Sequence, residues 1–143
     1  MKYKLVEGIA RADVAYEVYG KTREELFRNA AEALTQTMVD TATVKPLQNF
    51  KFQMSNFKLD GLLLDFLNKL VFLKDAKRML FSRFDVKIKK LDAKRYSLNG
   101  KLWGDTIDVA KHQLRTDVKA ATRHKLSVKK RKDIYIATII LDI

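Results

Sequence analysis

Two aspartates in largely apolar surroundings have the chemistry of a metal site. Asp13 lies at the start of a strand-like segment, and Asp142 ends an apolar segment and precedes Ile143 with its terminal carboxylate. Charges are rarely placed beside a buried strand end unless they are paired or bind a ligand. If the last strand ends beside Asp13, three carboxylates meet and suit a hard cation such as Ca²⁺ or Mg²⁺. On spacing alone, the simpler interpretation is favoured: Asp13 caps a turn and the C-terminus is frayed.

Carboxylates brought this close repel one another unless a cation or a lysine lies nearby, and Lys119 is a candidate counter-charge. Other catalytic chemistry is sparse. The chain has no cysteine, so it has neither a thiolate nucleophile nor a Cys-based zinc site. It has no phosphate-binding glycine loop and no Gly-x-Ser-x-Gly turn, and His112 and His124 lack a metal-binding spacing. We therefore expect no catalytic activity of its own.

The positive charge is concentrated in one part of the chain. The formal net charge is +12, and the segment from Lys111 to Lys132 holds nine Lys and Arg against one acid, Asp117. Such a block attracts phosphates, but it is equally typical of a solvated surface. We expect a hairpin turn that carries four adjacent cations, and it either contacts RNA or an acidic partner or is simply solvated; the four are Lys129, Lys130, Arg131 and Lys132.

Two helices and several strands can be predicted from the apolar periodicity. Thr22 and Glu25 form a capping box, in which each side chain bonds the other residue's backbone N–H, before an apolar stripe that extends to Met38. A second helix is expected from about Leu59 to Leu73. Strands are predicted near residues 14–19, 84–88, 95–103, 126–128 and 134–143, with the last one central and covered on both faces.

These elements predict one α+β domain over residues 1–143, a two-layer sandwich in which two main helices pack on a mixed or antiparallel sheet. The N-terminus has no continuous apolar run of the signal-peptide kind. No stretch approaches the length of a membrane span. We therefore expect a cytoplasmic protein without membrane contact.

Four segments in register resemble the archease family and together cover nearly the whole chain. Residues 12–31 are similar to the family's N-terminal signature, and residues 62–72 to its Leu-Leu-x-x-Trp-Leu-Asn-x-Leu helix. Residues 81–86 resemble the strand that follows. The C-terminal part is the most specific, with Val-Lys-Ala-Ala-Thr-x-His at 118–124 and the closing Asp142-Ile143.

The resemblance implies an accessory protein that activates the RtcB-type, GTP-dependent RNA ligase in tRNA splicing and RNA repair. Archeases speed the loading of guanylate onto the ligase and allow repeated turnover. Their metal-binding residues carry over to Asp13, Asp142 and the terminal carboxylate of Ile143, and their functionally important lysine to Lys119. The implied cofactor is a divalent ion, first of all Ca²⁺, with Mg²⁺ or Mn²⁺ as alternatives. The expected partners are the ligase and, through it, tRNA, but not DNA.

The chain departs from the family pattern at a few positions. Ala10-Arg11 replaces the family's His-Thr before Ala-Asp, and Phe66 replaces the tryptophan of the second helix. An apolar core can absorb the second change. The first makes a divergent paralogue conceivable, so two alternatives stay open: a modulator of an RNA methyltransferase, as reported for some archeases, and a free-standing basic RNA-binding module.

Overall fold

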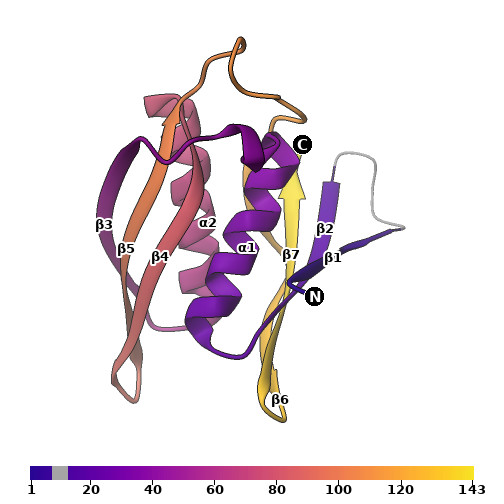
Figure 1. The fold of residues 1–143 in the computed structure, drawn as a ribbon. Coiled ribbons are helices and arrows are strands. Elements are labelled where there is room, and N and C mark those ends of the chain that lie inside the picture. Colours follow the sequence, from indigo (N-terminus) through magenta and orange to yellow (C-terminus); the bar gives the residue numbers. More distant parts are fainter. Residues whose placement is uncertain (8–12) are drawn as a thin grey trace.

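A computed structural model describes residues 1–7 and 13–143. Two helices stand between two antiparallel sheets (Figure 1). Helix α1 (Arg23–Met38) packs on β2, β4 and β7, and helix α2 (Leu59–Lys77) packs on β3, β4, β5 and β6. A short 3-10 turn, η1 (Thr41–Thr43), follows α1. The two helices thus bury their apolar side chains against both sheets.

The two sheets have different strand orders. One has the order β1-β2-β7-β6 and contains β1 (Tyr3–Val6), β2 (Asp13–Gly20), β7 (Ile134–Asp142) and β6 (Ala120–Arg131). The other has the order β3-β5-β4 and contains β3 (Gln48–Asn56), β5 (Arg95–Thr106) and β4 (Met79–Asp92). All neighbouring strands in both sheets are antiparallel.

The core is contributed by α1, α2 and the inner faces of both sheets. Phe66 of α2 is fully buried and stacks on Phe27 of α1, with ring centroids 5.8 Å apart, and on Phe52 of β3, at 6.0 Å. The phenylalanine that replaces the family's tryptophan is therefore held in an aromatic stack. In β7, Ile139, Ile140 and Leu141 are consecutive and all buried, so both faces of this central strand are covered near its C-terminal end.

The α+β prediction is confirmed, and three details differ from expectation. The strands form two sheets, one on each side of the helix pair, and among the described residues no strand of one sheet pairs with a strand of the other. Only one of the two predicted cap hydrogen bonds forms: Thr22 accepts from the Glu25 N–H at 3.0 Å. The Glu25 carboxylate accepts from the Lys21 N–H instead of the Thr22 N–H. Helix α2 continues four residues past Leu73 to Lys77, and the capping residue Arg78 is left-handed with φ 53°.

The basic hairpin is tighter than the predicted five-residue turn. Strand β6 extends to Arg131 and β7 begins at Ile134, so the turn consists of Lys132 and Asp133. Lys132 has φ 55°, the left-handed conformation that two-residue hairpin turns require. Lys129 and Lys130 are therefore strand residues with fixed directions, not loop residues.

No helix in the described part of the chain is both long and apolar enough to cross a membrane.

Candidate metal centre

Asp13 and Asp142 come together at the end of the four-stranded sheet. They are direct partners in the antiparallel pair of β2 and β7, and each is half-buried. Directly opposite residues of such a pair hold their Cβ atoms about 4.5–5.5 Å apart, and two like charges there destabilise the sheet. The register therefore creates a local excess of negative charge that a cation would neutralise.

The third residue of the predicted metal site, Ile143, comes directly after the end of β7. Its side chain packs against the core, so the residue next to Asp142 is held by apolar contacts. Residues 8–12, which include the Ala10-Arg11 departure, lie outside the described residues.

The backbone of Lys119 is tied to the same place. Its N–H donates to the Asp142 carbonyl at 2.8 Å, just before β6 begins, and Ala120 pairs with Asp142 across the ladder. The Lys119 side chain is exposed. The structure thus brings Asp13, Asp142 and Lys119 together on three neighbouring segments, although they are far apart in the sequence.

Two residues of α2 hold the segment that carries Lys119. The Asn68 amide donates to the Ala121 carbonyl at 3.0 Å and accepts from the Ala121 N–H at 2.8 Å. The Lys74 ammonium donates to the Val118 carbonyl at 2.7 Å and to the Asp117 carboxylate. Both side chains bridge from the helix to the start of β6.

Lys74 is buried, with 8% of its surface exposed, yet it remains charged. Burial by itself lowers the pKa of a lysine, but hydrogen bonds to Asp117 and Asp75 outweigh it and raise the pKa above 10.5. The ammonium has acidic partners on both sides, at 2.5 Å and 2.7 Å. An ion-paired lysine thus anchors the edge of the candidate site.

The donor set fits a hard divalent cation. Carboxylate oxygens are the ligands that Ca²⁺, Mg²⁺ and Mn²⁺ prefer. Among residues 1–7 and 13–143, no three His, Cys, Asp or Glu side chains gather closely enough to hold a metal. Asp13 and Asp142 would supply two donors, so a cation here would need further ligands from main-chain groups or solvent. A search for three clustered side chains therefore does not find this candidate site.

Three of the predicted basic residues, Lys129, Lys130 and Arg131, lie on the edge strand β6, Lys132 lies in the turn, and all four are exposed. Lys129 and Arg131 line a small hollow with Glu17 of β2, whereas Lys130 lies over the ring of Tyr135 at 5.4 Å. They are therefore not one cluster but project from the strand in different directions. Charged side chains on an edge strand also prevent unwanted strand pairing.

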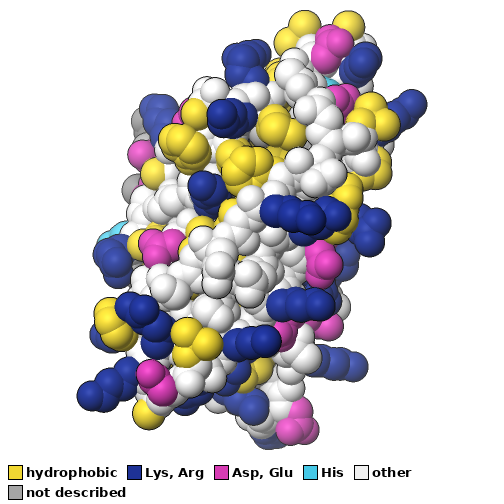
Figure 2. All heavy atoms as spheres, turned by 90° about the vertical axis from the view of Figure 1, so that its left-hand side faces the viewer, with side chains coloured by type: hydrophobic (Ala, Val, Ile, Leu, Met, Phe, Trp, Pro, Cys, Tyr) yellow, Lys and Arg dark blue, Asp and Glu magenta, His cyan; other side chains and the backbone are white. Residues whose placement is uncertain are grey.

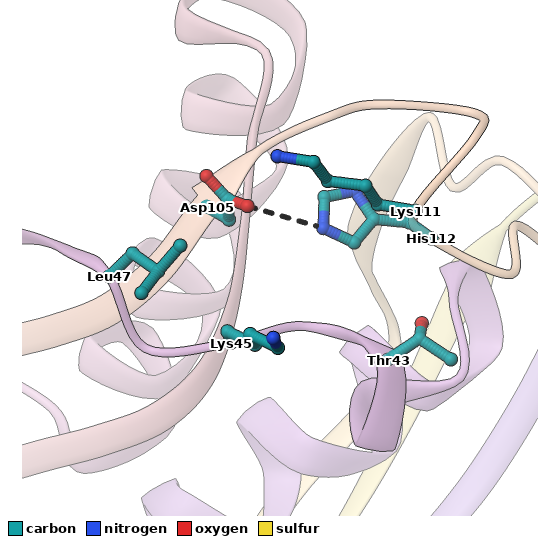
Figure 3. A pocket seen from close by; sticks show the side chains of 6 residues that line it. All are labelled: Thr43, Lys45, Leu47, Asp105, Lys111 and His112. Carbon is teal, nitrogen blue, oxygen red and sulfur yellow. Dashed lines mark ion pairs between the residues drawn. The ribbon is translucent and has the colours of Figure 1, made fainter.

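A separate cavity of about 330 Å³ lies where β5 leads into the 107–119 segment (Figure 3). The buried His112 accepts from the Asp108 N–H at Nδ1, at 3.0 Å, and its Nε2 lies 3.6 Å from the Asp105 carboxylate. The imidazole therefore holds the turn at Asp108, near the start of the segment that leads to Lys119. The sequence pattern did not indicate this role. The other residues lining this cavity are Thr43, Lys45, Leu47 and Lys111.

Comparison with known proteins shows which family the chain belongs to. Residues 3–143 match the model of the Archease protein family (MTH1598/TM1083). The chain belongs to the archease family. It is 37% identical to the protein archease of Sulfurisphaera tokodaii over 132 residues, which span 92% of this chain and 93% of the relative. It is 36% identical, with the same coverage, to the protein archease of Saccharolobus solfataricus.

Solved archease-like structures share the fold. The solution structure of protein 1598 from Methanobacterium thermoautotrophicum superposes with a TM-score of 0.85 at 32% identity, covering 99% of this chain and 98% of that one. A Thermotoga maritima protein described as an archease and possible chaperone gives a TM-score of 0.61 at 20% identity, covering 98% of both chains. This second likeness concerns the fold alone. The archease family and the α+β architecture agree with the sequence predictions.

Proposed function

We propose that this archease-family protein activates a GTP-dependent RNA ligase of the RtcB type, which seals RNA ends that carry a 3′-phosphate or cyclic phosphate. It promotes guanylylation and repeated turnover of the ligase and catalyses no reaction itself. The observation that supports this best is the register of β2 and β7, which sets Asp13 opposite Asp142. Family membership and the backbone link from Lys119 to Asp142 add to it.

The acidic end of the sheet would hold a divalent cation, in the first place Ca²⁺, through Asp13, Asp142 and the terminal carboxylate of Ile143. When bound, such an ion supplies positive charge that can polarise or orient phosphate oxygens. This chain's own residues do the rest. Asn68 and Lys74 hold the edge beside the site, and the exposed Lys119 offers a point charge for a phosphate or an acidic group of the partner.

The decisive experiment is sealing of a 3′-phosphate RNA by the cognate ligase under multiple-turnover conditions, with GTP and with or without this protein. We expect strong stimulation by the wild-type chain and loss of that stimulation in Asp13→Ala and in Asp142→Ala. Asp133→Ala is the matched control, because Asp133 is an exposed aspartate in the β6–β7 turn. Measuring the labelled guanylate bound to the ligase would show whether guanylylation or a later step is accelerated.

Calcium binding of the protein alone separates the site from the activity. If both aspartate variants still bind calcium and stimulate the ligase normally, the site assignment is wrong. If the folded wild-type protein gives no stimulation at all, ligase activation is wrong. The methyltransferase and RNA-binding alternatives would then come first.

A further inference from the structure

The three-stranded sheet has one face on the helices and one face in solvent. Along each strand the inward positions are apolar, as in Phe52, Val86 and Leu102, and the alternate positions point outward. We call the outward positions the outer sheet face. Figure 2 shows the side of the molecule that carries this sheet, with Lys and Arg side chains scattered over it. The outer sheet face comprises Asn49, Lys51, Gln53, Ser55, Arg83, Asp85, Lys87, Lys89, Ser97, Asn99, Lys101 and Trp103, of which Ser97 is covered by its neighbours.

The charge on this face is almost all of one sign. Five of its residues are Lys or Arg and one, Asp85, is acidic. Lys51 and Lys101 are direct cross-strand partners, an arrangement that destabilises a sheet. Asp85 is the cross-strand partner of Lys101 on its other side, but within the described part of the chain none of the five cations forms an ion pair with a carboxylate. One acid therefore offsets only part of the positive charge of this face, and a polyanion would neutralise the rest.

Aromatic rings lie among these cations. Trp103, the chain's one tryptophan, is half-buried on the outer sheet face between two of them. The Arg83 guanidinium lies 4.4 Å from its ring centroid and the Lys101 ammonium 4.9 Å. At the far end of the sheet, the Arg95 guanidinium lies 4.8 Å from the ring of Phe57, which is 65% exposed. Cation–aromatic pairs therefore stand at both ends of the basic surface.

We propose that the outer sheet face binds single-stranded nucleic acid, with phosphates on the lysines and arginines and bases stacked on the aromatic ends. Positive grooves combined with stacking rings are how proteins bind single strands without sequence preference. An acidic protein surface would use the cations but not the rings. A duplex keeps its bases stacked on one another, so it could not use the rings either.

The spacing of the two aromatic ends fits several nucleotides. Arg95 and Trp103 are eight positions apart on β5, which corresponds to about 27 Å along an extended strand. Between them lie cations from all three strands, among them Lys51, Lys87 and Lys89. This surface is separate from the acidic end of the other sheet and does not depend on the proposed ligase activation.

The fluorescence of Trp103 can report binding directly. Fluorescence of Trp103 in the intact protein would be followed while an unstructured RNA of about a dozen nucleotides is added, and then the DNA of the same sequence. The affinity would be measured in parallel by anisotropy of the labelled strand at several salt concentrations. We expect quenching of Trp103 on binding, with weaker binding to the matching duplex. The expected salt dependence has a slope of about −0.7 per phosphate contact.

Two charge-matched triple variants locate the surface. Arg83→Glu/Lys87→Glu/Lys101→Glu should weaken binding by about tenfold or more and reduce the salt slope. Lys129→Glu/Lys130→Glu/Arg131→Glu carries the same charge change on β6 and should keep the affinity within about twofold. In a second pair, Trp103→Ala should lose about tenfold in affinity and Trp103→Phe should retain most of it, because phenylalanine still stacks.

Circular dichroism and thermal unfolding would verify that each variant is folded. The proposal is overturned if the two triple variants weaken binding equally, because binding would then follow net charge alone. It is also overturned if Trp103 is not quenched, or if polyglutamate or the duplex binds as tightly as the single strand. Equal binding of RNA and DNA supports a general single-strand surface, and a preference for RNA supports recognition of the 2′-hydroxyl as well.

Discussion

Asp13 and Asp142 face each other across the antiparallel pair of β2 and β7, although 128 residues of chain separate them. Their strands are held in this register by the apolar residues behind them, such as Val18, which pairs with Ala137, both fully buried. A slip by one residue would turn these buried groups to solvent. The core therefore fixes the two aspartates opposite each other, and we expect their carboxylates to repel when no metal is bound.

Removing one of these charges should stabilise the protein when no metal is present. Asp13→Asn keeps the shape of the side chain and abolishes the like-charge pair, so the free energy of unfolding in chelator should rise by about 0.2–1 kcal/mol. In saturating calcium the order should reverse, because only the wild type gains binding energy, about 2.7 kcal/mol at a calcium concentration one hundred times Kd. Thermal or urea unfolding with and without calcium checks both.

Asp133→Asn is the control for this experiment, since it removes the same charge from an exposed turn position. It should leave both the chelator and the calcium values unchanged relative to wild type. Equal responses of Asp13→Asn and Asp133→Asn would mean that net charge is being measured and that no specific site exists.

Loss of the Lys74 ammonium should destabilise the fold at neutral pH. Lys74→Met keeps the chain length but leaves the Val118 carbonyl without its partner. We expect a loss of about 1–3 kcal/mol in unfolding free energy, the usual range for a buried group deprived of its hydrogen bond. Urea unfolding at pH 7 measures it. Lys77→Met is a matched control, because Lys77 is an exposed lysine on the same last turns of α2.

The Lys74 contribution should also have a distinct pH range. Its pKa in the folded protein is raised above the ordinary 10.5, so its stabilisation is complete below pH 10.5 and is lost as pH rises through the folded pKa. The difference in unfolding free energy between wild type and Lys74→Met should therefore be constant up to about pH 10 and shrink above it. Tyr3 and Tyr19 also have pKa values raised, chiefly by burial, but both proteins share them. A difference that shrinks already between pH 6 and pH 9 would contradict this assignment.

Asn68 should matter for the position of Lys119 more than for the core. Asn68→Ala removes both hydrogen bonds to the Ala121 backbone and leaves that N–H and carbonyl without their helix partner. We expect a loss of about 1–3 kcal/mol in stability and faster amide exchange at Ala121. Stimulation of the ligase by Asn68→Ala should also fall by more than the small unfolded fraction of the variant can explain. Measuring stimulation well below the melting temperature, where the variant is folded, would show this. Normal stimulation by a destabilised Asn68→Ala protein would limit Asn68 to a structural role.

The sequence was informative where local pattern decides the structure. The apolar stripes predicted both helices, and the all-apolar last segment predicted the central place of β7. The pairing of β7 with β2 did not follow from the sequence, because the residue spacing alone favoured a turn cap at Asp13 and a frayed C-terminus. The division into two sheets did not follow, because alternation within a strand does not reveal which hairpins share a sheet.

Side chains that act through tertiary contacts were also missed. Lys74 would be expected to lie at the surface, since lysines are seldom buried, and its burial depends on partners that the distant 117–118 segment adds to the neighbouring Asp75. The stacking of Arg83 on Trp103 depends on the register of β4 with β5, which includes an irregularity after Phe81. A bulge of this kind leaves no clear trace in the residue pattern.

The basic residues of β6 permit a kinetic prediction. Lys129 and Arg131 line one hollow and Lys130 lies on Tyr135, so their charges are spread over an exposed edge strand rather than gathered in a pocket. Such charges influence the rate of encounter more than the stability of a complex. If this strand approaches the ligase or its RNA, reversing all three charges should slow association with the ligase by about tenfold at low salt and leave dissociation nearly unchanged. Surface plasmon resonance at two salt concentrations measures both rates.

If the association rate is unchanged at low salt, these residues only protect an exposed strand edge. If dissociation becomes faster, they contact the partner directly in the complex.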